Sequence, residues 1–255
     1  MAYLQSAIRS LALGMDTNLN IILPADRYDA EGRPAPFDKV LYMLHGLKQN
    51  ADAWPRMSAI ERYANRCGYA VIIPEVQRSW YCDLPGGTNY FTYITQELPE
   101  LVHRMFKLPE GRENTYIGGL SMGGYGALKC ALRRPDLYCG AMCFSSGFFS
   151  LENPQRLMKI YYSLGEMQSI LGQELKLRDE DSLDYLIRHF PEDAQKPKLY
   201  LSCGTKDRLF SSNIRARDLL KEKGFDVTWE AWEGIHDWDF WDAAAERSMK
   251  FFAEK

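Results

Sequence analysis

The sequence predicts an α/β fold with a mostly parallel central sheet and helices on both of its faces. Short, nearly continuous apolar runs such as KVLYMLHG and YAVIIP are typical of strands that are buried on both faces. Segments with helical spacing, such as residues 51–68, separate these runs. Because strands that alternate with helices are joined by right-handed crossovers, this order indicates a parallel sheet.

The expected elements follow one another in a regular order. Two extended segments near residues 2–13 and 19–23, with a turn centred on Gly14, are expected to form an antiparallel edge. Further strands are expected near residues 39–46, 69–74, 114–119, 138–147, 197–204 and 225–234. Helices are expected over residues 51–68, 89–107, 125–134, 214–223 and 240–253, and Pro99 predicts a kink or break in the second of these.

One stretch interrupts the alternation of strands and helices. Residues 148–196 are largely polar and helical in pattern and contain no strong strand candidate. A connection of this length is uncommon inside a compact domain, so we expect it to be an inserted helical cap on a single domain of residues 1–255.

Composition and charge exclude several classes of function. The net charge is −3 and no run of Lys and Arg occurs, which argues against a nucleic-acid partner. No stretch approaches 18 apolar residues, and the first residues lack the pattern of a signal peptide, so we expect no membrane partner. Six cysteines without a CxxC pair are expected to be buried free thiols, which predicts a cytoplasmic location; they are Cys67, Cys82, Cys130, Cys139, Cys143 and Cys203.

The segment YIGGLSMGGYG, residues 116–126, places Ser121 between an apolar run and a predicted helix. Its GLSMG core fits the G-x-S-x-G nucleophile elbow, in which glycines leave room for a sharp turn that lifts the serine clear of the sheet. The alternative is a glycine-rich strand-to-helix turn without chemistry. The backbone amide of Met122 is expected to point to the same space and to stabilise an oxyanion.

A serine needs a base, and the sequence has four histidines to offer. His103 lies in a predicted helix, His189 lies in the inserted region, and His45 is expected to bond within its own loop. His236 follows the last strand candidate and precedes the last helix, from where it could reach the elbow. We therefore expect His236 to be the base.

The acid that orients the histidine should lie between the serine and the histidine in the chain. Asp207 follows the strand of residues 197–204 by a few positions and is the best candidate, although it could be a plain turn aspartate. The acids of the polar insertion, including Asp181 and Asp184, are expected to be solvated. The loop after residues 39–46 is expected to supply a second oxyanion amide, from Leu47.

Four segments together resemble a known family: LHGLKQNADAW, GLSMGGYGALKCALRRPDLY, CGTKDRLFSSNIRARDLL and EGIHDWDFWD. They are similar to the putative-esterase branch of the α/β-hydrolase superfamily, above all to bacterial tributyrin esterases. S-formylglutathione hydrolases, feruloyl and acetylxylan esterases and antigen 85 mycolyltransferases are more distant. The resemblance implies an α/β-hydrolase fold, Ser121, Asp207 and His236 as a catalytic triad, and Leu47 and Met122 as oxyanion amides.

We therefore expect a serine carboxylesterase that acts on short acyl or aryl esters and needs neither cofactor nor metal. Aromatic residues in loops near the site are expected to wall its pocket; they are Trp54, Trp80, Tyr81 and Trp238. An esterase of the feruloyl or acetylxylan type, an acyltransferase with the same triad, and a non-catalytic receptor are the alternatives. The expected partner is a small-molecule ester, and a homo-oligomer is left open.

Overall fold

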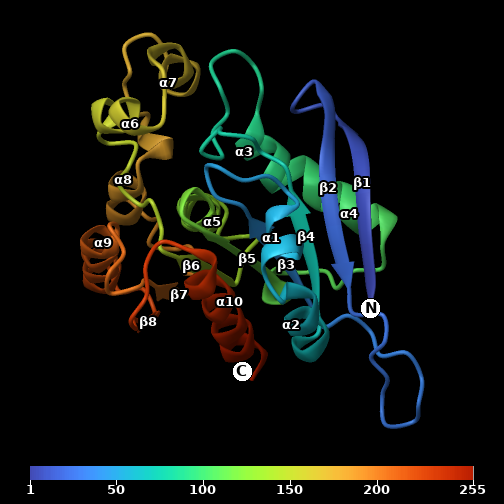
Figure 1. Cartoon of the computed structure of the whole chain (residues 1–255). Helices are drawn as coiled ribbons and strands as arrows, with labels where there is room; N and C mark the ends of the chain where they lie inside the picture. Colours follow the sequence, from blue (N-terminus) through green and yellow to red (C-terminus); the bar gives the residue numbers. More distant parts are fainter. Residues whose placement is uncertain (255) are drawn as a thin grey trace.

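The structure is a computed structural model that describes residues 1–254, and it confirms the α/β fold class (Figure 1). Eight strands form one sheet in the order β1-β2-β4-β3-β5-β6-β7-β8. The antiparallel edge is confirmed, because β1 pairs with β2 and β2 with β4 in antiparallel register, whereas every other pair is parallel. The strands are Ala2–Ser10 (β1), Met15–Leu23 (β2), Lys39–Leu44 (β3), Tyr69–Pro74 (β4), Thr115–Leu120 (β5), Gly140–Phe144 (β6), Lys198–Ser202 (β7) and Val227–Glu230 (β8).

Helices cover both faces of the sheet. Residues of α1, α2 and α10 pack in the core on one face, and residues of α4, α5 and α9 pack in the core on the other. The helices are Ala53–Met57 (α1), Ile60–Cys67 (α2), Tyr90–Thr92 (α3), Leu98–Met105 (α4), Met122–Arg133 (α5), Pro154–Ile160 (α6), Leu164–Leu171 (α7), Leu183–Arg188 (α8), Phe210–Glu222 (α9) and Trp238–Ala253 (α10). A π-helical turn, Tyr93–Glu97 (η1), joins α3 to α4, and Arg112–Asn114 (η2) and Asp179–Asp181 (η3) are 3-10 turns.

The register of the parallel strands brings several loops to one edge of the sheet. Leu44 of β3 is paired with Gly119 of β5, and Leu120 of β5 is paired with Phe144 of β6. Phe144 is in turn paired with Ser202 of β7. The chain therefore leaves β3, β5, β6 and β7 at nearly the same level, where ligands bind in open α/β sheets.

Of the kink or break expected at Pro99, the break is not found. The chain stays helical from Tyr90 to Met105, and its irregular part is the π-helical turn before the proline. Pro99 has no N–H to bond the carbonyl of Thr95, four residues earlier. That carbonyl instead accepts a hydrogen bond from Nη1 of Arg134 at 2.9 Å, so the missing donor is replaced.

Residues 148–196 are helical, as predicted, and contain α6, α7, η3 and α8. Figure 1 shows α6 and α7 together at one end of the molecule, well away from the C-terminal end of α10. All six cysteines are free; Cys139 is half-buried and the other five are buried. No helix within residues 1–254 is long and apolar enough to cross a membrane.

Candidate active site

Ser121 occupies a strained turn between β5 and α5. Its backbone has φ 54° and ψ −113°, in a region that residues with a side chain rarely adopt. The turn is held on both sides: the Ser121 N–H donates to the Phe144 carbonyl at 2.9 Å, and the Gly147 N–H donates to the Ser121 carbonyl at 2.9 Å. The strained turn is therefore held by the end of β6 and the loop that follows it.

The two glycines of the G-x-S-x-G sequence are required by close backbone contacts. A Cβ atom on Gly119 would lie 2.7 Å from the Leu44 carbonyl oxygen, and one on Gly123 would lie 2.4 Å from the same atom. Such distances are far shorter than real Cβ contacts. These glycines let α5 begin at Met122, three residues before the predicted start at Tyr125, against the end of β3.

The structure brings Ser121, His236 and Asp207 together in one chain of hydrogen bonds. Nε2 of His236 lies 3.0 Å from Oγ of Ser121, and Nδ1 of the same ring lies 2.8 Å from Oδ2 of Asp207. An ionised carboxylate can only accept, so the bond to Asp207 assigns the proton of the neutral ring to Nδ1. The lone pair of Nε2 then faces the serine hydroxyl.

Asp207 is 5% exposed and lies in the turn after β7. Burial by itself raises the pKa of its carboxyl group, but the hydrogen bond and charge of His236 and the Leu209 N–H oppose this effect, and the pKa lies below its ordinary value. The Leu209 N–H donates to Oδ1 at 2.8 Å. The carboxylate is therefore ionised at neutral pH, with one oxygen held by the backbone and the other facing His236.

The other histidines lie elsewhere, as the sequence predicts. His45 is fully buried: its Nδ1 lies 2.9 Å from the Gly46 carbonyl, and its Nε2 accepts a hydrogen bond from the Val76 N–H at 3.2 Å. The first bond lies within the loop after β3, and the second joins this loop to the loop after β4. His103 lies on α4, and His189 follows α8 and stacks on Tyr185.

The residues of the two predicted oxyanion amides, Leu47 and Met122, both lie close to Ser121 in the fold or in the chain. Met122 is the first residue of α5, where the N–H of a helix has no carbonyl partner in a preceding turn. Leu47 follows β3 and lines the same cavity as Ser121 and His236. The aligned strand ends therefore put both predicted oxyanion amides next to the serine turn.

A cavity of about 350 Å³ opens at Ser121 and His236. Its walls come from the loops after β3, β4, β6 and β7, from α10, and from the helical segment of residues 148–196. That segment contributes an apolar side made of Phe149, Leu157, Ile160 and Tyr161. The volume lies at the low end of the usual range for small-molecule pockets.

Of the four aromatic residues expected to wall the pocket, Trp80 lines the cavity. Among the described residues that line the cavity, Trp54, Tyr81 and Trp238 do not occur. Trp54 is fully buried, and its indole N–H donates to the Leu44 carbonyl at 3.0 Å. The Tyr81 hydroxyl donates to the His45 carbonyl at 2.7 Å. Both side chains therefore bond the backbone at the end of β3 and do not line the cavity.

Trp238 packs edge-on against Trp54 and Trp241, with ring centroids 5.1 and 5.5 Å away. Trp241, which is not among the four expected wall residues, also lines the cavity. Its ring lies edge-on to His236 at 4.9 Å. Trp238 and Trp241 are about one turn apart on α10, and of these two Trp241 reaches the site.

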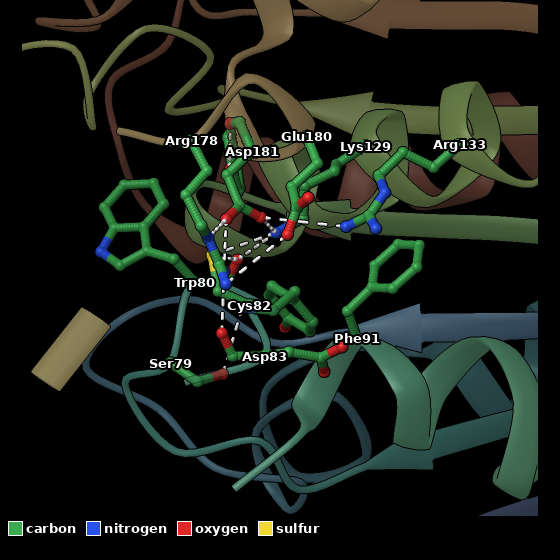
Figure 2. Close-up of polar contacts among 12 residues, drawn as sticks. Ser79, Trp80, Cys82, Asp83, Phe91, Lys129, Arg133, Arg178, Glu180 and Asp181 are labelled. Atoms are coloured by element: carbon green, nitrogen blue, oxygen red, sulfur yellow. Dashed lines mark hydrogen bonds and ion pairs between the residues drawn. The ribbon is translucent and has the colours of Figure 1, made fainter. Parts of the chain in front are cut away.

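A buried ion-pair cluster next to the site was not expected from the sequence (Figure 2). The ammonium group of Lys129, on α5, lies 2.9 Å from Oδ1 of Asp181 and 3.1 Å from the Trp80 carbonyl. Nε of Arg178 donates to Oδ2 of Asp181 at 2.8 Å, and its Nη2 donates to the Asp83 carbonyl at 2.7 Å. The cluster joins α5, the loop after β4 and residues 178–181.

The expectation that Asp181 is solvated is therefore wrong, because the residue is 1% exposed and has three cationic partners: Lys129, Arg178 and, at 4.0 Å, Arg133. Burial raises the pKa of its carboxyl group, but Lys129 and Arg178 outweigh burial and hold it below its ordinary value. Burial lowers the pKa of Lys129, yet Cys82 and Asp181 keep it above its ordinary value. Since burial raises the pKa of Cys82 to about 11, that thiol is neutral at pH 7, and the charge of Lys129 is balanced by Asp181.

Comparison with known proteins adds a family to this geometry. A sequence model of the family described as "Putative esterase" matches residues 10–251. The chain belongs to this family. An acetyl esterase of Caldicellulosiruptor saccharolyticus is 32% identical over 268 residues, which cover 100% of this chain and 99% of that protein.

Two solved structures are similar over the whole length. The fluorophosphonate-binding serine hydrolase F of Staphylococcus aureus is 33% identical, with a TM-score of 0.88 over 100% of this chain and 99% of that one. An S-formylglutathione hydrolase of Staphylococcus aureus is also 33% identical, with a TM-score of 0.86 over 99% and 98% of the two chains. This member of the putative esterase family is a serine esterase with the α/β-hydrolase fold, as the sequence predicts.

Proposed function

We propose that Ser121 is the nucleophile of this esterase, His236 its general base and Asp207 the acid that orients the histidine. The observation that supports this proposal is the continuous set of bonds from Asp207 through His236 to Ser121. The strained backbone of Ser121 and the amides at Leu47 and Met122 support the same assignment.

The reaction follows from these positions. Oγ of Ser121 attacks the ester carbonyl carbon while its proton moves to Nε2 of His236, and the amides of Leu47 and Met122 bind the oxyanion that forms. Cleavage of the C–O bond releases the alcohol, which takes the proton back from His236. Water then attacks the acyl-enzyme with the same base, which frees the acid and restores Ser121.

We propose short acyl and aryl esters as substrates. The cavity is small, and Trp80, Tyr161 and Trp241 give it aromatic walls that can stack on a flat acyl or alcohol group. The relatives point to the same class, since one is named an acetyl esterase and another an S-formylglutathione hydrolase.

Substitution of the serine tests the mechanism. Ser121→Ala is expected to lower kcat for p-nitrophenyl acetate by roughly 10⁴-fold or more, because the rest of the triad cannot act without its nucleophile. Ser211→Ala, an exposed serine on α9, is the matched control and is expected to keep full activity. Comparable activity in Ser121→Ala and wild type would refute the serine mechanism.

The organisation of the chain is part of the proposal. We propose that residues 1–255 form a single α/β-hydrolase domain in which residues 148–196 act as a cap, supported by the contribution of that segment to the cavity wall. A cytoplasmic location, supported by the six free cysteines, also stays a prediction, and the oligomeric state is left open.

A further inference from the structure

The Lys and Arg residues that line the cavity are not matched by acidic ones. Three cationic side chains line it: Lys48, Arg156 and Arg208. Among its described lining residues there is no Asp or Glu. This is unexpected for a protein with a net charge of −3, in which acidic residues outnumber Lys and Arg by 34 to 31.

Within the part of the chain that the structure describes, these three cations have no acidic partner. Within residues 1–254, none of them lies within 4.0 Å of a carboxylate, although most of the other Arg residues near the site do. Asp207, next to Arg208 in the chain, is buried and bonded to His236. Asp237, next to His236, accepts from the Phe240 N–H as the N-cap of α10. Asp207, within the proposed triad, and Asp237, next to it in the chain, therefore both have hydrogen-bond partners other than these cations.

Two of the cations also meet at one aromatic ring. The Lys48 ammonium lies 4.9 Å from the ring centroid of Tyr161, and the Arg208 guanidinium lies 6.0 Å from it. The sum of these distances, about 11 Å, is the upper limit for their separation. Like charges this close repel one another at low salt, and a bound anion would remove the repulsion.

The positions of the cations relative to the reacting groups limit where such an anion would lie. Lys48 directly follows Leu47, whose amide is proposed for the oxyanion, and Arg208 directly follows Asp207. Consecutive Cα atoms are about 3.8 Å apart, so both cations start within one residue of the proposed machinery. An anionic group a few bonds from the ester carbonyl could therefore reach them.

We propose that the preferred substrate of this esterase is an ester that carries a carboxylate or phosphate group within a few bonds of the scissile bond. This inference rests on the proposed function, because it places the ester carbonyl at Ser121. The anion belongs either to the acyl part or to the alcohol, and the same three cations would bind it in both cases. Exposed ion pairs contribute modestly, so we expect each cation to change kcat/KM by about 1.5- to 5-fold.

Paired substrates test the proposal. For the alcohol side, kcat/KM is measured for 3-acetoxybenzoate and for neutral 3-acetoxybenzamide. For the acyl side, it is measured for the 4-nitrophenyl monoester of glutarate and for the neutral 4-nitrophenyl ester in which the free carboxylate is replaced by a carboxamide. The rate in buffer alone is subtracted. The readout is the ratio of anionic to neutral kcat/KM in wild type and in the triple variant Lys48→Gln, Arg156→Gln, Arg208→Gln.

The triple variant is expected to lower this ratio by roughly 3- to 100-fold in at least one pair, and the pair that responds identifies the side that carries the charge. Raising NaCl from 50 to 500 mM should lower the wild-type ratio, because salt screens exposed charges. Lys159→Gln is the matched control: it removes an exposed cation from the same helix as Arg156, but outside the cavity.

The proposal is overturned if the triple variant leaves both ratios unchanged, or if Lys159→Gln lowers them as much as the triple variant does. Failure of the proposed function is a separate result, because it would show as hydrolysis of the neutral esters by Ser121→Ala. Wild-type hydrolysis of the neutral esters without any anion preference would keep the serine mechanism and refute only the substrate class.

Discussion

Asp181→Asn is expected to destabilise the protein severely without touching the triad. The substitution removes the negative charge that lies 2.9 Å from the Lys129 ammonium group, which is fully buried. Removing one partner of a buried ion pair costs about 3–5 kcal/mol, because the remaining charge is left in the interior. For a chain of this size, each kcal/mol lowers Tm by about 2–4 °C, so we expect a decrease of roughly 6–20 °C.

Differential scanning calorimetry at pH 7 measures this change, and Asp184→Asn is the control. Asp184 is partly exposed and pairs with Arg188 at the surface, where ion pairs contribute about 0–1 kcal/mol. The double variant Lys129→Met, Asp181→Asn should unfold at a higher temperature than Asp181→Asn alone, because it no longer buries an unpaired charge on Lys129. Equal Tm values for Asp181→Asn and Asp184→Asn would refute the reasoning.

The effect also has a defined pH dependence. The pKa of Asp181 is lowered in the folded protein, so its contribution to stability is present above the ordinary aspartate pKa of about 3.9 and is lost as the pH falls through the folded value. The Tm difference between wild type and Asp181→Asn should therefore be constant from pH 5 to 7 and shrink in stronger acid. A difference that grows on acidification would contradict the assignment of a charged Asp181.

Three further predictions concern the reaction. Asp207→Asn should keep Tm within a few degrees while kcat falls by about 10⁴-fold, because an amide favours the wrong tautomer of His236; unchanged kcat would show that the acid is misassigned. In the p-nitrophenyl series, kcat/KM should be high for C2–C4 acyl groups and fall steeply by C8, and a maximum at C8 or longer would contradict the small walled cavity. Iodoacetamide should inactivate slowly or not at all, because burial raises the pKa of Cys82 to about 11 and that of Cys203 to about 12; fast inactivation would implicate a thiol.

The strands, the turn at the serine and the residues of the proposed triad could be predicted from the sequence because local patterns encode them. Apolar runs identified the buried strands. The glycines around Ser121 identified the turn, since a Cβ atom on Gly119 or Gly123 would lie too close to the Leu44 carbonyl oxygen. His236 and Asp207 could be placed because both follow strands whose ends share one edge of the sheet. These are properties of the topology, and they do not depend on the direction of individual side chains.

Side-chain direction and distant contacts could not be predicted in the same way. Trp54 follows the loop after β3, and Tyr81 lies in the loop after β4 beside Trp80. Both point into the core, and nothing in their sequence positions distinguishes them from Trp80. Asp181 is surrounded by polar residues in the sequence, which suggested a solvated site. Its partner Lys129 lies 52 positions away, and only the packing of η3 on α5 buries the pair.

The central claim, that Ser121 is the nucleophile, is tested most directly by mapping a covalent adduct. After treatment with diisopropyl fluorophosphate, intact-mass and peptide mass spectrometry should show one adduct on the wild type, on the peptide that contains Ser121, together with complete loss of activity. Ser121→Ala should remain unmodified. An adduct on another residue, or full activity in the modified wild type, would contradict the account.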